Sequence, residues 1–221
     1  MMVSLFSSFD PSTSNLIHLN WMSSLYILFI IPLNYWTTSS QFIKTWTIMY
    51  ERIHYELKTI LTNKYVGSTL IMTSLFLIIL LNNMVGLIPY VFTSTSHIIF
   101  PLSFSIPLWT SFMMFNWLKK TNQSFTHLVP EGTPPMLLPL TVMIETMSNL
   151  IRPSVIALRL TANMMAGHVL MTLLGNSLPE SHNYETMMMI LIQSSLLMFE
   201  MMVAIVQAYV FMILMSLYLS E

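Results

Sequence analysis

The sequence predicts an all-α integral membrane protein that forms a single membrane domain over residues 1–221. Hydrophobic residues make up 55% of the chain, whereas Asp, Glu, Lys and Arg together make up only 8%. Soluble domains usually carry about 25% charged residues. A surface this poor in charge would not stay solvated in water, and no charged residue at all occurs from 65 to 118. The composition therefore excludes an ordinary soluble fold.

The first two elements are predicted near the N-terminus. A membrane span is expected at about 21–38, where tryptophans near both ends are typical of membrane interfaces. The next segment, 44–64, carries apolar residues at helical spacing and charged residues largely elsewhere around the helix, which predicts an amphipathic helix lying on the membrane surface. A solvated loop helix is the alternative. The apolar positions are Trp46, Met49, Ile53, Leu57 and Ile60.

Two further spans are predicted inside the uncharged stretch. One membrane crossing needs about 20 apolar residues, so this stretch is long enough for two. The polar residues 93–97 divide it into expected spans at 66–90 and 98–118.

Two long helices are expected in the C-terminal half, at 139–174 and 185–220. Each would be about 54 Å long at 1.5 Å per residue, which exceeds the ~30 Å hydrocarbon layer. We therefore expect both helices to tilt strongly or to lie partly along the membrane plane, and the polar linker between them to close a hairpin.

Basic residues predict the orientation of the chain. They gather in the 44–64 segment and in the loop two crossings later, so both loops belong on the positive-inside face and the N-terminus on the opposite face. These residues are Lys44, Arg52, Lys58, Lys64, Lys119 and Lys120.

Ionisable and amide residues inside the two long helices are the candidate functional residues. A charge within the membrane is costly and marks a functional site by default. Residues seven apart fall near one face of a helix, and this spacing recurs in both segments. The first helix contains Glu145, Arg152, Arg159, Asn163 and His168; the second contains Glu200 and Gln207, with Glu221 at its end.

These residue types suit proton transfer. An arginine keeps its proton, whereas histidine and glutamate exchange theirs. The arrangement predicts a proton path in two parts, which the fixed charge of Arg159 separates. His168 and Glu200 form one part, and Glu145 and Glu221 form the other. Structural alternatives remain open: Arg152 or Arg159 as an ion-pair partner, His168 as a core histidine and Glu221 as a solvated terminus.

Other classes of function find less support. The chain has no cysteine, and acidic and basic residues nearly balance at 9 and 8, so neither a thiolate metal site nor nucleic-acid binding is expected. Motifs for phosphate loops, metal pairs or nucleophilic serines are missing, so we expect no catalytic residue, cofactor or metal. The 22 methionines are interpreted as apolar filler. A self-contained channel or transporter would favour internal repeats, which we do not find between the two halves, and a purely structural subunit would leave the charges unexplained.

Five segments resemble subunit a of the mitochondrial F-type ATP synthase family, and together they run in order along nearly the whole chain. The most specific is RLTANMMAGH at 159–168. The others are NMVGLIPY at 83–90, VPEGTP at 129–134, IET at 144–146 and QAYVF at 207–211.

The resemblance implies a non-catalytic, proton-translocating stator subunit in the mitochondrial inner membrane, with its N-terminus in the intermembrane space and segment 44–64 on the matrix surface. Its partners would be protons, the bilayer, the rotating c-ring and other membrane-sector and peripheral-stalk subunits. The implied roles are an essential arginine at Arg159, an intermembrane-space half-channel at His168 and Glu200, a matrix half-channel at Glu145 and Glu221, and polar residues near the arginine at Asn163 and Gln207. Arg152 receives no transport role.

Overall fold

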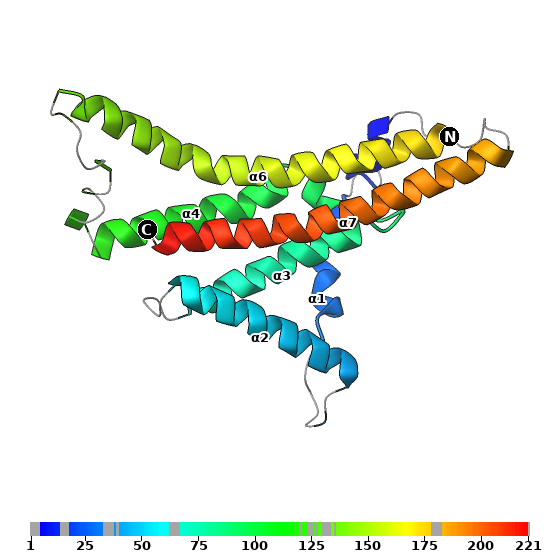
Figure 1. The fold of residues 1–221 in the computed structure, drawn as a ribbon, viewed down its shortest axis with the longest axis horizontal. Helices are drawn as coiled ribbons and strands as arrows, with labels where there is room; N and C mark the ends of the chain where they lie inside the picture. Colours follow the sequence, from blue (N-terminus) through cyan, green and yellow to red (C-terminus); the bar gives the residue numbers. More distant parts are fainter. Residues whose placement is uncertain are drawn as a thin grey trace. The chain divides into compact units, whose positions relative to one another are not determined.

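The structure is a computed structural model whose regular elements are all helical over the part of the chain that it describes (Figure 1). This confirms the all-α prediction. The described residues are 5–13, 18–32, 38, 40–61, 67–119, 121–122, 126, 128–129, 134, 136–177 and 183–220.

The chain divides into two compact units, and the boundary between them falls inside one long helix. Unit 1 comprises Met1–His97 and Thr161–Glu221, and unit 2 comprises Ile98–Leu160. Unit 1 contains η1 (Leu5–Phe9), η2 (Leu19–Leu25), α1 (Ile27–Ile30), α2 (Gln41–Leu61), α3 (Ser68–Gly86), η3 (Ser94–Ser96), the C-terminal part of α6 (Leu138–Ser177) and α7 (Asn183–Ser220). Unit 2 contains α4 (Ile99–Lys119) and the N-terminal part of α6.

The core of unit 1 lies where α3 runs alongside α7 (Figure 1). Buried residues on α7 recur at intervals of three and four, so they form one stripe along the helix. Two of them are alanines, and small residues let membrane helices approach closely. The buried residues of α7 in this stripe are Ala204, Ala208, Phe211, Met212 and Met215, and α3 buries Met72, Leu75 and Phe76 among others.

Helix α2 is amphipathic, as its sequence predicts, and the C-terminal end of its apolar stripe packs within unit 1. Leu57 and Leu61 are buried, and α2 contacts both α3 and α7. The Tyr209 hydroxyl donates a hydrogen bond to Glu56 Oε2 at 3.2 Å, which ties α7 to the polar side of α2. Gly67 directly precedes α3 and has φ 87°, a left-handed conformation that glycine adopts without strain.

Three of the described helices, α3, α6 and α7, are long and apolar enough to cross a membrane. Helices α6 and α7 have 40 and 38 residues, which corresponds to about 60 and 57 Å at 1.5 Å per residue. The expected 98–118 span coincides with most of α4, which has Pro107 inside it and is not one of these three helices. In the expected 21–38 span, the described regular elements are η2 and α1, and residues 33–37 lie outside the described residues.

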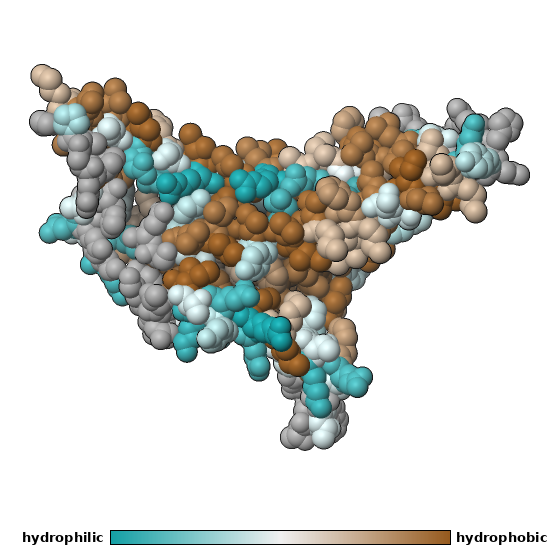
Figure 2. Space-filling view, viewed as in Figure 1, coloured by the Kyte–Doolittle hydropathy of each residue, from teal (hydrophilic) through white to brown (hydrophobic). Residues whose placement is uncertain are grey.

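Large hydrophobic side chains also cover much of the surface (Figure 2). In a protein dissolved in water, extended apolar patches of this kind are rare. In a bilayer they face lipid, so the exposed apolar surface agrees with the charge-poor composition.

We predict that the turn after η1 loosens at acid pH. Asp10 Oδ1 accepts hydrogen bonds from the Ser12 backbone N–H at 3.0 Å and from the Ser12 hydroxyl at 2.8 Å. These two hydrogen bonds hold the pKa of the exposed Asp10 carboxyl below its usual value, and the bond from the backbone N–H has the larger effect. A lowered pKa in the folded state stabilises the turn above the unfolded-state pKa of about 4, and this stability is lost as the pH falls through the folded-state pKa. Amide hydrogen exchange at Ser12 should show this loss, and Asp10→Asn should remove the pH dependence.

Candidate functional site

Helix α6 meets the Glu200 side chain of α7 at Gly167. A Cβ atom built on Gly167 would lie 2.6 Å from Glu200 Oε1 and 2.8 Å from Glu200 Cδ. Only a residue without a side chain permits this contact as it stands. The Glu200 carboxylate therefore rests against the α6 backbone at the residue that precedes His168.

His168 and Glu200 are each half-buried, and each has one fully buried polar atom. Nε2 of His168 and Oε1 of Glu200 have no hydrogen-bond partner among the described residues. Buried polar atoms in proteins are nearly always paired with protein or water, so two such atoms on neighbouring helices mark a site with unused hydrogen-bonding capacity. We call this pair the His168–Glu200 site.

Polar groups of α3 and η3 pack near the same part of unit 1. Asn83 Nδ2 donates to the backbone carbonyl of Ala204, one turn beyond Glu200, at 3.4 Å, and its Oδ1 is buried without a partner in the described part of the chain. The backbone of Gly86 faces the His168 imidazole. A Cβ on Gly86 would lie 3.3 Å from the Thr93 methyl carbon, so the start of η3 packs directly on this glycine.

Sequence reasoning did not assign a role to these supporting residues. The sequence predicts a break between two spans at residues 93–97, and Asn83 and Gly167 belong to the segments that resemble the family, without a role of their own. The signal that was available is a pair of adjacent amides, Asn82 and Asn83, at the end of an apolar helix. Asparagine side chains in membrane helices commonly form hydrogen bonds to other helices.

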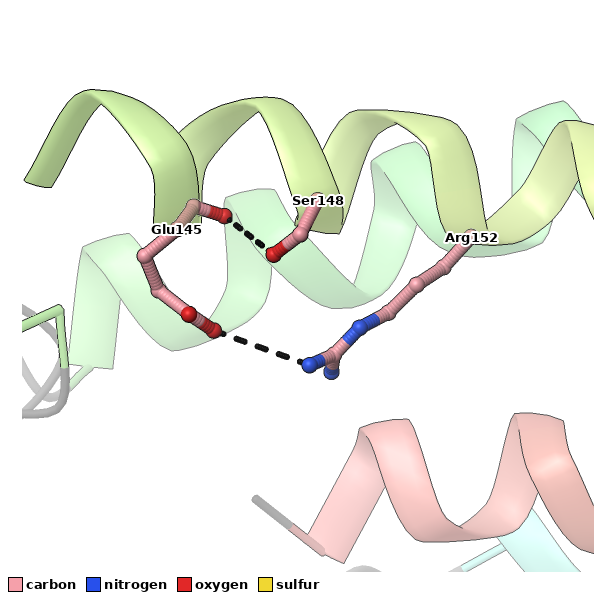
Figure 3. A network of polar contacts seen from close by, with 3 residues as sticks. All are labelled: Glu145, Ser148 and Arg152. Carbon is pink, nitrogen blue, oxygen red and sulfur yellow. Dashed lines mark hydrogen bonds and ion pairs between the residues drawn. The ribbon is translucent and has the colours of Figure 1, made fainter. Parts of the chain in front are cut away.

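The structure places Glu145 in an ion pair with Arg152 (Figure 3). Glu145 Oε1 lies 3.6 Å from Arg152 Nη2, and the two side chains are 36% and 33% exposed. The Ser148 hydroxyl donates to the Glu145 backbone carbonyl at 2.8 Å. The ion pair confirms that these two residues, seven apart, share one face of α6. Arg152 therefore fills the ion-pair role that its sequence left open.

The remaining predicted site residues are distributed over both units. Arg159 is exposed on the unit 2 part of α6, and Asn163 and Gln207 are half-buried in unit 1 on α6 and α7. Glu221 lies outside the described residues. Within the described part of the chain, no group of three or more His, Cys, Asp or Glu residues could hold a metal ion.

Comparison with known proteins identifies the class of protein. The sequence model of the ATP synthase A chain family matches residues 17–220. The chain therefore belongs to this family of membrane proteins. Its relatives include proteins named ATP synthase subunit a from Anopheles gambiae, Aedes aegypti and Drosophila melanogaster, which are 51%, 52% and 48% identical to it. Each alignment covers 100% of this chain and 99% of the relative. The family is subunit a of the membrane sector of ATP synthase, which confirms the resemblance found in the sequence.

Proposed function

We propose that this chain is the proton-translocating stator subunit of a mitochondrial ATP synthase. The observation that carries the proposal is the His168–Glu200 site. It holds a carboxylate and an imidazole on neighbouring helices in a chain whose helices could span a membrane, each with a buried polar atom available for a proton or a water.

The chemistry of this pair supports proton relay. Histidine exchanges its proton near neutral pH, and a carboxylate that rests against the backbone of the preceding residue offers a second acceptor within the low-dielectric membrane. Neither buried atom is held by a competing protein partner among the described residues. The site would form the half-channel through which protons enter from the intermembrane space.

Arg159 supplies the fixed charge that the mechanism needs. A guanidinium does not lose its proton in a protein, so it blocks direct proton passage between two half-channels and attracts an ionised carboxylate of the rotating c-ring. Its exposed position on α6 suits a contact with another subunit. Glu145 and Glu221 would line the matrix half-channel, and Asn163 and Gln207 would lie near the arginine.

The proposal also covers the orientation of the chain in the membrane and its partner subunits. The N-terminus would lie in the intermembrane space and α2 on the matrix surface of the inner membrane, with the c-ring, other membrane-sector subunits and the peripheral stalk as partners. Proton flow through the two half-channels would turn the ring. ATP chemistry would belong to the soluble head, with none in this chain.

A double-mutant cycle tests the site. Glu200→Gln and His168→Ala, each alone, should lower proton flux through the assembled synthase in vesicles by about 100-fold, the low end of what a proton-transfer group contributes. The double variant should be little worse than the more severe single variant, because both residues serve one path. The matched control is Glu185→Gln, which makes the same chemical change at an exposed carboxylate in the first turn of α7 and should leave flux unchanged. Independent, additive losses would contradict the shared relay.

A further inference from the structure

Phe9, far from α6 in the sequence, contacts the His168 imidazole. The ring centroids of Phe9 and His168 are 6.2 Å apart and the rings are at 86°, an edge-to-face arrangement. Phe9 is only 8% exposed although it ends a short 3-10 helix near the N-terminus. One side of the imidazole is therefore covered by an N-terminal side chain.

His97 anchors this contact through the backbone of Phe9. His97 Nε2 lies 2.9 Å from the Phe9 carbonyl oxygen, and because a carbonyl can only accept, the nitrogen donates. The His97 ring is itself placed by two aromatic rings, Phe92 at 5.2 Å and Trp21 at 5.4 Å between centroids. Segments η1, η2 and the loop around η3 thus converge on Phe9.

We propose that Phe9 is a positioning residue for His168: its ring fixes the orientation of the imidazole and limits the access of water to it, and His97 acts through Phe9. The functional consequence rests on the proposed role of His168 in proton transfer. Edge-to-face aromatic contacts contribute about 0.5–1.5 kcal/mol beyond the area they bury, so the contact is strong enough to bias one ring orientation. The N-terminal segment then becomes part of the proton-entry site.

The test measures the chemical reactivity of His168 itself. In the assembled synthase, diethyl pyrocarbonate modifies accessible neutral imidazoles, and mass spectrometry reads the rate at His168 relative to His54 of α2. Phe9→Ala should raise this ratio at least threefold, which corresponds to about 0.7 kcal/mol. His97→Ala should change the ratio in the same direction, and Phe9→Tyr, which keeps the ring, should retain the protection.

The matched control is Phe6→Ala, which removes a phenyl ring from the same short helix at a position that is 59% exposed. It should leave the ratio unchanged. An unchanged ratio in Phe9→Ala, an equal rise in Phe6→Ala or loss of protection in Phe9→Tyr would each overturn the inference. A parallel rise at His54 would do the same, because it would show general loosening of unit 1.

Proton flux separates this inference from the proposed function. If Phe9→Ala raises His168 labelling and also lowers flux, both are supported. If labelling rises while flux stays at the wild-type level, Phe9 shields His168 but does not position it for proton transfer, and the functional part of the inference is overturned. The relay role of His168 is then decided by the His168→Ala variant, which removes the imidazole itself.

Discussion

Replacing Arg159 with alanine is expected to abolish coupled ATP synthesis while the soluble head still hydrolyses ATP. The physical reason is the permanent charge: alanine can neither attract an ionised carboxylate of the ring nor separate two proton paths. Passive proton leak should rise in the same preparation. Three measurements on vesicles check these expected results: ATP synthesis driven by an imposed proton gradient, uncoupled ATPase activity and passive proton leak.

The control for this experiment is Arg52→Ala, which makes the same chemical change at an exposed position of α2. It should keep synthesis near the wild-type rate. If Arg159→Ala still synthesises ATP near the wild-type rate, the fixed charge is not needed and the proposed mechanism is wrong.

Gly167→Ala is expected to lower ATP synthesis at least tenfold in a complex that still assembles. The new methyl carbon would lie 2.6 Å from Glu200 Oε1, and ordinary contact begins at 3.4 Å, so the carboxylate must move. Because the obstructing atoms are the flexible end of one side chain, the helices need not separate. Overpacking costs about 1–3 kcal/mol, and the gain in helix propensity on replacing glycine by alanine, about 1 kcal/mol, offsets part of it. Proton transfer is more sensitive, since a 1 Å misplacement can cost about 100-fold.

Gly175→Ala provides the matched control on the same helix. A Cβ at Gly175 meets nothing within 4 Å. This variant should keep full synthesis and gain up to about 1 kcal/mol of stability. If the thermal stability of the Gly167→Ala complex falls sharply while its remaining synthesis per complex is normal, Gly167 serves packing and not the position of Glu200.

The long helices could be predicted because their signal is local. Long, mainly apolar runs place the two C-terminal helices at 139–174 and 185–220, and α6 and α7 occupy 138–177 and 183–220. Helix α2 begins at Gln41, whereas the predicted segment begins at 44. The earlier start follows from Ser40, whose hydroxyl accepts from the Ile43 N–H at 3.4 Å and whose carbonyl accepts from the Lys44 N–H at 3.0 Å. A serine at this position is a recognised start signal, so this boundary was present in the sequence.

The candidate site could be predicted from the sequence only in part. His168 and Glu200 could be selected from the sequence because an ionisable residue in an apolar helix is conspicuous. Their surroundings could not, because those depend on contacts between distant segments. Nothing near Phe9 indicates that its ring meets His168, and no local pattern shows that the Glu200 carboxylate lies on Gly167. Such contacts arise from tertiary packing, which a hydropathy pattern does not encode.

The hydrogen bond from Asn83 to Ala204 has a consequence for the depth of Glu200 in the membrane. Apolar contact between α3 and α7 is non-directional, so on its own it would tolerate sliding of one helix along the other. A slip of one turn would carry Glu200 about 5.4 Å along the axis. The Asn83 amide donates to one particular carbonyl, four residues beyond Glu200, and so favours one axial register of the two helices. An amide on a different helix thus contributes to the axial position of the carboxylate.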